Sequence, residues 1–428
     1  MRHRPALAPL LIAFLVLGAP VWAGDGTSGA PPLASGLEVV SRPYAFSLSR
    51  WEARALAGLV GRGLAQSWRP GLDPTADRRA VERFAELTML ADRLSSQRDE
   101  ASTLPVGQER TRRLTEVGQQ LFAVDAERDS LTTPVEEIVG WQVEQVLAQD
   151  GLREHFLSMD RSGGGLLARL VVTPGVSFDL GGTPNVLFVS PRSRIQLVGS
   201  VLVRPSLSFE EIDRLEASAD KLNVASLVSP IGGLAAYPSM VPPSGSVAEL
   251  LRTVCHEWTH HYLAFRPLGQ AYFNDYEMRS INETVADLIG MEVGQQVLGE
   301  FYAQNVSVSF SRGVSMLGPA GVAEDTAPSF GDLMREIRRT VEVYLADGDV
   351  PGAEAYMAEQ RAELATKGYF VRRLNTAYLS FFGAYSGGAN PYEEKLRRVR
   401  AASGSIAEFA RRVSDIRSVH DLTVIAGD

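Results

Sequence analysis

Cysteine is almost absent from this sequence: Cys255 is the only one among 428 residues. A single cysteine excludes an intramolecular disulfide, and with it the disulfide-rich class of small secreted domains. Cys255 lies in an apolar run directly before a histidine. We therefore expect it to be a small buried hydrophobic residue rather than a nucleophile.

The sequence also has fewer positively charged residues than negatively charged ones. The chain has 42 Lys and Arg against 51 Asp and Glu, which gives a net charge of −9. A nucleic-acid partner normally requires a basic face, so the composition argues against one. The hydrophobic fraction of 45% and the charged fraction of 22% are typical of a folded globular protein rather than of a disordered chain.

The N-terminus has basic residues followed by an apolar stretch at 7–21. This stretch is short for a membrane-spanning helix and contains Pro9 and Pro20. Together with the small residue Ala23, this order predicts a signal peptide at residues 1–23. The mature protein is then expected outside the cytoplasm, either secreted, periplasmic or in the cell envelope. The alternative is an uncleaved N-terminal membrane anchor that associates the protein with a membrane.

The composition along the chain predicts several regions. Residues 24–48 begin with many Gly, Ser, Ala and Pro residues, which is typical of a flexible leader. Residues 49–162 have apolar side chains at three- and four-residue steps, which predicts helices. Asp73-Pro74 and Thr133-Pro134 are expected helix starts, because each places a capping-type residue before proline.

Residues 163–300 have a different hydrophobic pattern. Short apolar runs at 166–172, 185–189 and 195–203 predict the strands of a small sheet. Helical patterns then return, and residues 301–428 are predicted to form a C-terminal helical subdomain. The expected fold class is α+β with helices dominating.

The main chemical signal is His256-Glu257-Trp258-Thr259-His260, on a helix predicted at 246–265. Histidines four residues apart lie one above the other on a helix, so two imidazoles can reach one Zn²⁺ ion. Glu257 points about a hundred degrees away and can act as a general base on a water at the metal. His261 points away from the two histidines, and we expect it to be structural or exposed.

The next predicted helix, at 280–297, contains a candidate third ligand. Catalytic zinc requires three protein ligands and one open position. Glu283 and Asp287 are four residues apart and share a face of this apolar helix. Glu283 can ligate the metal, while Asp287 can accept a hydrogen bond from the outer nitrogen of a ligand histidine.

The pairing of His256-Glu257-x-x-His260 with Asn282-Glu283-x-x-x-Asp287 resembles the gluzincin metallopeptidases, the group that includes thermolysin. The resemblance covers only about residues 245–294. It implies a zincin-like catalytic core at residues 163–300, in which a small sheet accompanies two metal-bearing helices. It also implies His256, His260 and Glu283 as ligands of one zinc ion, with Asp287 holding the first histidine.

Further site residues are weaker hypotheses. Peptide hydrolysis requires a donor that stabilises the developing oxyanion, and Tyr378 lies in an aromatic stretch that could supply it. Packing of that tyrosine in a helical core is the alternative. The segment 232–238, which includes Tyr237, could bind a substrate strand along its edge, or it could be a plain connection.

These observations predict a zinc-dependent peptidase, a hydrolase that cleaves peptide or protein substrates with a metal-activated water and Glu257 as general base. Two alternatives remain at the level of the sequence. One is an inactive or non-peptidase zinc-binding envelope protein that acts as an interaction module. The other is a structural helical protein in which the motif is coincidental.

Overall fold

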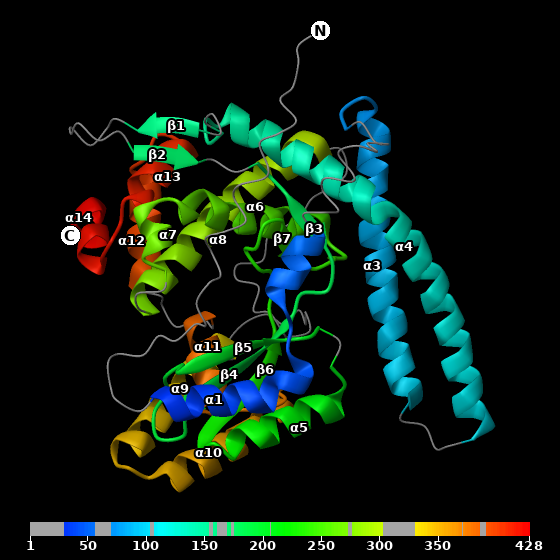
Figure 1. Ribbon diagram of the computed structural model, residues 1–428, viewed down its shortest axis with the longest axis vertical. Coiled ribbons are helices and arrows are strands. Elements are labelled where there is room, and N and C mark those ends of the chain that lie inside the picture. The colour runs from blue at the N-terminus through cyan, green and yellow to red at the C-terminus, as the bar shows by residue number, and fades with distance from the viewer. Residues whose placement is uncertain are drawn as a thin grey trace.

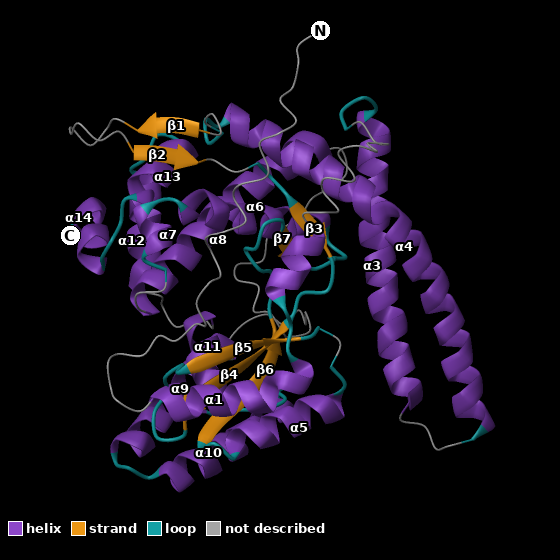
Figure 2. Cartoon of the chain, viewed as in Figure 1, coloured by secondary structure: helices purple, strands orange, loops and turns teal. Residues whose placement is uncertain are grey.

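The computed structural model describes residues 30–55, 70–102, 107–153, 157–160, 169–172, 175–205, 207–272, 276–302, 330–369, 371–385 and 391–428. Helices dominate this part of the chain and small sheets accompany them (Figures 1 and 2), so the predicted α+β class is confirmed. The predicted signal peptide lies outside the described residues. None of the described helices has the length and hydrophobicity that a membrane crossing requires.

The elements follow one another in a simple order. The first helices are α1 (Ala30–Ser41), the 3₁₀ helix η2 (Arg42–Tyr44), α3 (Pro74–Ser102) and α4 (Gln108–Gln149). The middle of the chain contains β1 (Leu157–Asp160), β2 (Arg169–Val172), β3 (Phe178–Leu180), β4 (Asn185–Pro191), β5 (Gly199–Val203), α5 (Phe209–Asp220), β6 (Val224–Pro230) and β7 (Ser239–Val241). The remaining helices are α6 (Val247–Ala264), α7 (Pro267–Gln270), α8 (Tyr276–Tyr302), α9 (Phe330–Ala346), α10 (Val350–Thr366), α11 (Thr376–Tyr385), α12 (Pro391–Ala401), α13 (Ile406–Ser414) and α14 (Val419–Ala426).

The largest sheet has three antiparallel strands in the order β5-β4-β6. Its central strand β4 has consecutive buried residues, as expected when both faces of a sheet are covered. One hydrophobic cluster joins the sheet to α1 and α5, and another joins Leu227 of β6 to α9, α10 and α11. Figure 1 shows these helices around the sheet.

The C-terminal residues therefore do not form one separate helical subdomain. Helices α9–α11 complete the sheet region, whereas α12–α14 pack in the main hydrophobic cluster with α6 and α8. Arg400 of α12 also donates hydrogen bonds of 2.8 and 2.6 Å to Glu292 of α8. The predicted region 301–428 is thus divided between two cores, because the apolar faces of its helices match two different partners.

The predicted flexible leader is wrong for residues 30–44. They form α1 and η2, and the side chain of Leu37 is only 2% exposed. Leu33, Leu37 and Val40 lie at three- and four-residue steps and pack against the sheet. The small residues among them obscured this apolar stripe in the sequence.

Helices α3 and α4 form a long hairpin that projects from the body (Figure 1). The predicted start at Asp73-Pro74 is confirmed, since Asp73 Oδ1 accepts hydrogen bonds from the amides of Thr75 and Ala76. The predicted start at Pro134 is wrong, because α4 continues through that residue. Burial of Val135 and the residues that follow it in the main cluster outweighs the backbone hydrogen bond that proline removes.

Helices α6 and α8 pack closely in the main cluster, and two glycines make this possible. A Cβ atom on Gly290 would lie 2.9 Å from the backbone nitrogen of His256, and one on Gly294 would lie 3.1 Å from Cα of Arg252. These glycines are four residues apart, so they share the face of α8 that meets α6. The backbone carrying His256 therefore lies directly on α8.

We predict that Gly290→Ala lowers the free energy of unfolding by about 1–3 kcal/mol, since the added methyl group meets backbone that cannot move independently. Gly299→Ala on the same helix is the matched control, because a Cβ there meets nothing within 4 Å. Its gain in helix propensity should stabilise the protein by up to about 1 kcal/mol. Urea unfolding measures both changes, and equal stabilisation by the two substitutions would contradict the close helix contact.

Candidate metal centre

The motif helix is confirmed by α6. Ser246 caps its N-terminus by accepting a hydrogen bond of 3.4 Å from the amide of Glu249. His256 and His260 lie one turn apart, with their ring centroids 4.8 Å from each other. Apolar residues on the remaining faces of α6 anchor the helix in the main cluster. Packing of α6 thus holds both imidazoles toward α8.

Three ligand-type atoms converge between the two helices. His256 Nε2 and His260 Nε2 are 3.1 Å apart, and they lie 3.4 and 3.5 Å from Glu283 Oε2. The side chains of His256, His260 and Glu283 are 16%, 14% and 16% exposed, so solvent still reaches the group. These residues, which the sequence predicted as ligands, form a group that could hold a metal ion.

The outer nitrogens of both histidines are held by side chains of α8. His256 Nδ1 lies 3.1 Å from Asp287 Oδ1, and His260 Nδ1 lies 2.9 Å from Asn282 Oδ1. Both oxygens accept the imidazole proton, which leaves the Nε2 lone pairs for a metal. The position of Asp287 agrees with its predicted role. Asn282 was missed as a positioning residue, although it stands inside the motif.

Glu283 is held by a tyrosine from the segment between the two helices. The hydroxyl of Tyr272 donates a hydrogen bond of 2.7 Å to Glu283 Oε1, on the carboxylate oxygen opposite the two histidines. The ring of Tyr272 also lies edge-on to His260, with 6.1 Å between centroids. Its place between the motifs was the only sequence signal for this contact.

The electrostatics of the group favour positive charge. Burial lowers the pKa of His256, but its hydrogen bonds to Asp287 and Glu283 outweigh burial and hold the pKa well above its usual value. Burial raises the pKa of Glu283, yet the two histidines outweigh it and hold this pKa well below its usual range. The Glu283 carboxylate is therefore ionised. A bound cation would stabilise this negative charge, as the protonated imidazole of His256 does.

Glu257 lies beside the group without joining it. Its side chain is only 5% exposed, and burial raises its pKa. Gly233 packs directly on this carboxylate, because a Cβ atom on Gly233 would overlap Glu257 Oε1. The residues leading into β7 thus confine the Glu257 side chain against α6.

His261 is structural, as predicted. Its Nε2 lies 2.5 Å from the carbonyl oxygen of Ala236 and 3.3 Å from Ser239 Oγ. Burial lowers its pKa to about 4, so the ring is neutral at pH 7 and donates to the carbonyl. The half-buried Tyr237 packs on this ring with 5.4 Å between centroids. His261 therefore fastens α6 to the segment that covers Glu257, while substrate binding by Tyr237 stays a prediction.

The two other side chains singled out in the sequence lie in cores. Cys255 is fully buried, and burial raises the pKa of its thiol, in agreement with the expected inert role. Tyr378 of α11 packs with α9 and α10 in the second hydrophobic cluster, rather than in the cluster of α6 and α8. Burial raises its pKa to about 12. Its predicted role as an oxyanion donor stays a prediction.

Comparison with known proteins adds no relative from which a function could be transferred. No protein-family model, no curated protein and no solved structure matches the chain. The functional argument therefore depends on the geometry of the site.

We predict that His260→Ala abolishes stoichiometric metal binding, because two of the three ligands cannot hold the ion in a closed geometry. Asp287→Asn should retain the ligands but weaken zinc affinity by about 10- to 100-fold, since the outer hydrogen bond is weakened. His420→Ala is the control, because His420 is exposed on α14. Competition titration with a fluorescent chelator measures all three. Parental affinity in the His260 variant would refute the ligand assignment.

Proposed function

We propose that the chain is a zinc-dependent peptidase of the gluzincin type, which hydrolyses peptide bonds with Glu257 as general base. The observation that carries the proposal is the convergence of His256, His260 and Glu283 beside the confined Glu257. Two imidazoles with one carboxylate are a ligand set of catalytic rather than structural zinc. On this proposal α6, α8 and the neighbouring strands form a zincin-like core, and the protein acts outside the cytoplasm.

Distances between the ligand atoms support zinc as the metal. In a tetrahedral site with bonds of about 2.0–2.1 Å, neighbouring ligand atoms are about 3.3–3.4 Å apart. The three separations here are 3.1, 3.4 and 3.5 Å. A hard cation such as Mg²⁺ would instead favour oxygen ligands and octahedral geometry. A zinc ion held there would polarise the scissile carbonyl and lower the pKa of a water molecule toward about 7.

Glu257 supplies the proton transfers of the proposed reaction. Its carboxylate takes a proton from the attacking water and delivers that proton to the leaving amine. The raised pKa of this buried carboxylate suits the first step, because a stronger base takes the proton of the water more readily. If Glu257 were itself a metal ligand, its carboxylate could not carry the proton. Its position beside the three ligands therefore matters.

Two further features support a peptide substrate. The backbone of Leu234 pairs with Met240 through hydrogen bonds of 3.0 and 2.9 Å. Among the described residues, the backbone groups of Gly233 and Ala235 form no hydrogen bond, so they offer an edge to an extended peptide. The hydroxyl of Tyr272 lies next to Glu283 and is therefore nearer the ligand group than Tyr378, but it can donate to an oxyanion only by releasing its hydrogen bond to Glu283.

Glu257→Gln is expected to retain zinc while peptide hydrolysis falls by several orders of magnitude, because the amide is isosteric but cannot accept the proton. Quenched-fluorescent peptide libraries, with and without a chelator, provide the activity measurement, and elemental analysis provides the zinc content. Hydrolysis by the Gln variant at the parental rate would refute the assigned base. Parental protein that binds zinc but cleaves no peptide would favour an interaction module.

Gly233→Ala is expected to displace Glu257 and to lower kcat at least about 10-fold with zinc content unchanged, since misplacement of a catalytic group by about 1 Å is costly. Gly182→Ala in a nearby loop is the matched control, because its Cβ would meet Pro205 at an ordinary 3.5 Å. Steady-state kinetics on the best library peptide compare the two. Equal activity would show that the covering segment does not position the base.

A further inference from the structure

Arg279 of α8 is a cation near the metal centre that the proposed reaction does not use. It precedes Glu283 by four residues, so it lies on the same helix face, about 6 Å along the axis. Its guanidinium carbon is 5.5 Å from the ring centroid of Tyr272, whose hydroxyl contacts Glu283. The guanidinium is thus separated from a metal ligand by a single aromatic ring.

Arg279 also lacks an anionic partner in the described part of the chain. Its Nε is buried and has no hydrogen-bond partner there, and no ion pair joins the side chain to a described carboxylate. Burying an Nε–H group that has no hydrogen-bond acceptor is costly, and stacking of the half-buried Arg279 on one tyrosine offsets only part of that cost. The side chain therefore has unused capacity for a planar anion.

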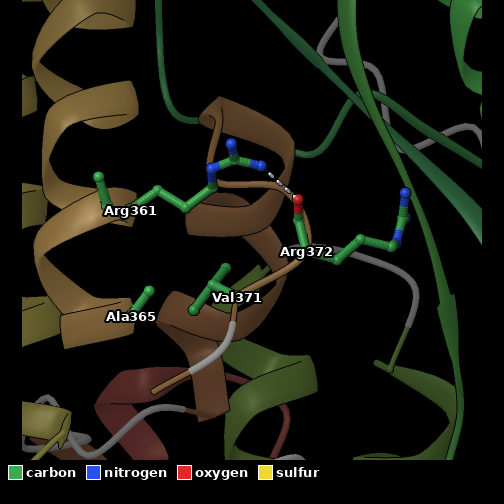
Figure 3. Close-up of a pocket in the computed structure, with 5 residues that line it drawn as sticks. Arg361, Ala365, Val371 and Arg372 are labelled. Atoms are coloured by element: carbon green, nitrogen blue, oxygen red, sulfur yellow. Dashed lines mark hydrogen bonds between the residues drawn. The ribbon is translucent and has the colours of Figure 1, made fainter. Parts of the chain in front are cut away.

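The arginines that line a pocket elsewhere in the protein do have partners. A pocket of about 370 Å³ is lined by Arg361, Ala362, Ala365, Val371 and Arg372. Arg361 donates a hydrogen bond of 2.9 Å to the carbonyl oxygen of Arg372 (Figure 3). Arg372 in turn donates to both carboxylate oxygens of Glu216. These guanidinium groups serve the fold, so the pocket does not offer a comparable anion site.

Arg252, at the other end of the metal centre, is also paired. It lies 3.1 Å from Glu249 and 3.5 Å from Asp287. The positive charge at that end is therefore neutralised by carboxylates of the protein, whereas no described carboxylate forms an ion pair with Arg279.

We propose that Arg279 binds a carboxylate of the substrate and makes the enzyme selective for peptides that place this group next to the scissile bond. The inference rests on the proposed peptidase function. A guanidinium donates two parallel hydrogen bonds to a carboxylate, a geometry that an amide cannot match. The carboxylate comes either from the peptide C-terminus or from an acidic side chain.

The first experiment uses ligands that do not need to be hydrolysed. Monohydroxamates of succinic, glutaric and adipic acid chelate zinc and present a carboxylate at increasing reach, and their carboxamide analogues are the matched probes. Calorimetry on the zinc-loaded full chain should show about 10- to 100-fold tighter binding of the best acid than of its amide. Arg279→Gln should abolish this ratio, and Arg279→Lys should keep part of it because only the point charge remains.

Arg397→Met is the matched control, since Arg397 is a half-exposed helical arginine of α12 that pairs with Glu393. It should keep the parental ratio. Equal binding of acid and amide to the parental protein, or a ratio unchanged by both Arg279 variants, would overturn the proposal and leave the metal centre intact. Failure of every hydroxamate to bind would instead contradict the zinc site, and the inference would fall with it.

Peptide hydrolysis then distinguishes the two sources. Paired libraries with a free or amidated C-terminus, and with Asp and Glu or Asn and Gln, are cleaved by the parent and by Arg279→Gln. A C-terminal carboxylate predicts that the variant loses kcat/KM only for the free acids, and an acidic side chain predicts loss only for Asp and Glu peptides. An equal loss for all four libraries would overturn carboxylate selectivity.

Discussion

The close approach of α6 and α8 is the constraint on which the rest of the site depends. Gly290 and Gly294 remove side chains from the contact, so the α8 backbone lies against the segment of α6 that carries His256. At this distance short carboxylate and amide side chains of α8 reach both imidazoles of α6. With larger residues between the helices, Asn282, Glu283 and Asp287 would face the histidines without contacting them.

The surroundings of Glu283 and Glu257 shift the pKa values of these two carboxylates in opposite directions. Glu283 is surrounded by imidazole and hydroxyl groups, which stabilise its ionised form. Glu257 is covered by Gly233 in the segment that leads to β7, and burial there favours its protonated form. Because neighbouring residues of a helix point about a hundred degrees apart, one turn of α6 supplies both a candidate metal ligand and the residue that we propose as the proton carrier. Opposite pKa shifts at neighbouring carboxylates are the pattern expected of acid–base chemistry.

Local periodicity explains how much of this could be predicted from the sequence. His256, His260, Glu283 and Asp287 were found because helical spacing determines which side chains share a face, and the helices formed where the pattern placed them. Contacts between distant segments carry no such periodic signal. The packing of Gly233 on Glu257, the hydrogen bond from Tyr272 and the division of the C-terminal helices between two cores all arise from tertiary structure. The same is true of α4, where tertiary burial overrides the local preference of Pro134.

The charges at the two ends of the ligand group differ, and this difference would orient the proposed substrate. Asp287 and Arg252 neutralise one another at the end of the centre nearest His256. At the end nearest His260, Tyr272 stacks with Arg279, which forms no ion pair within the described ranges of the chain. Since the ligand group lies between these ends, a peptide bound across it meets a neutral environment on one side and a cation on the other. Shape alone would allow an extended peptide to bind in either orientation, whereas a single fixed charge favours the orientation that brings a carboxylate to Arg279.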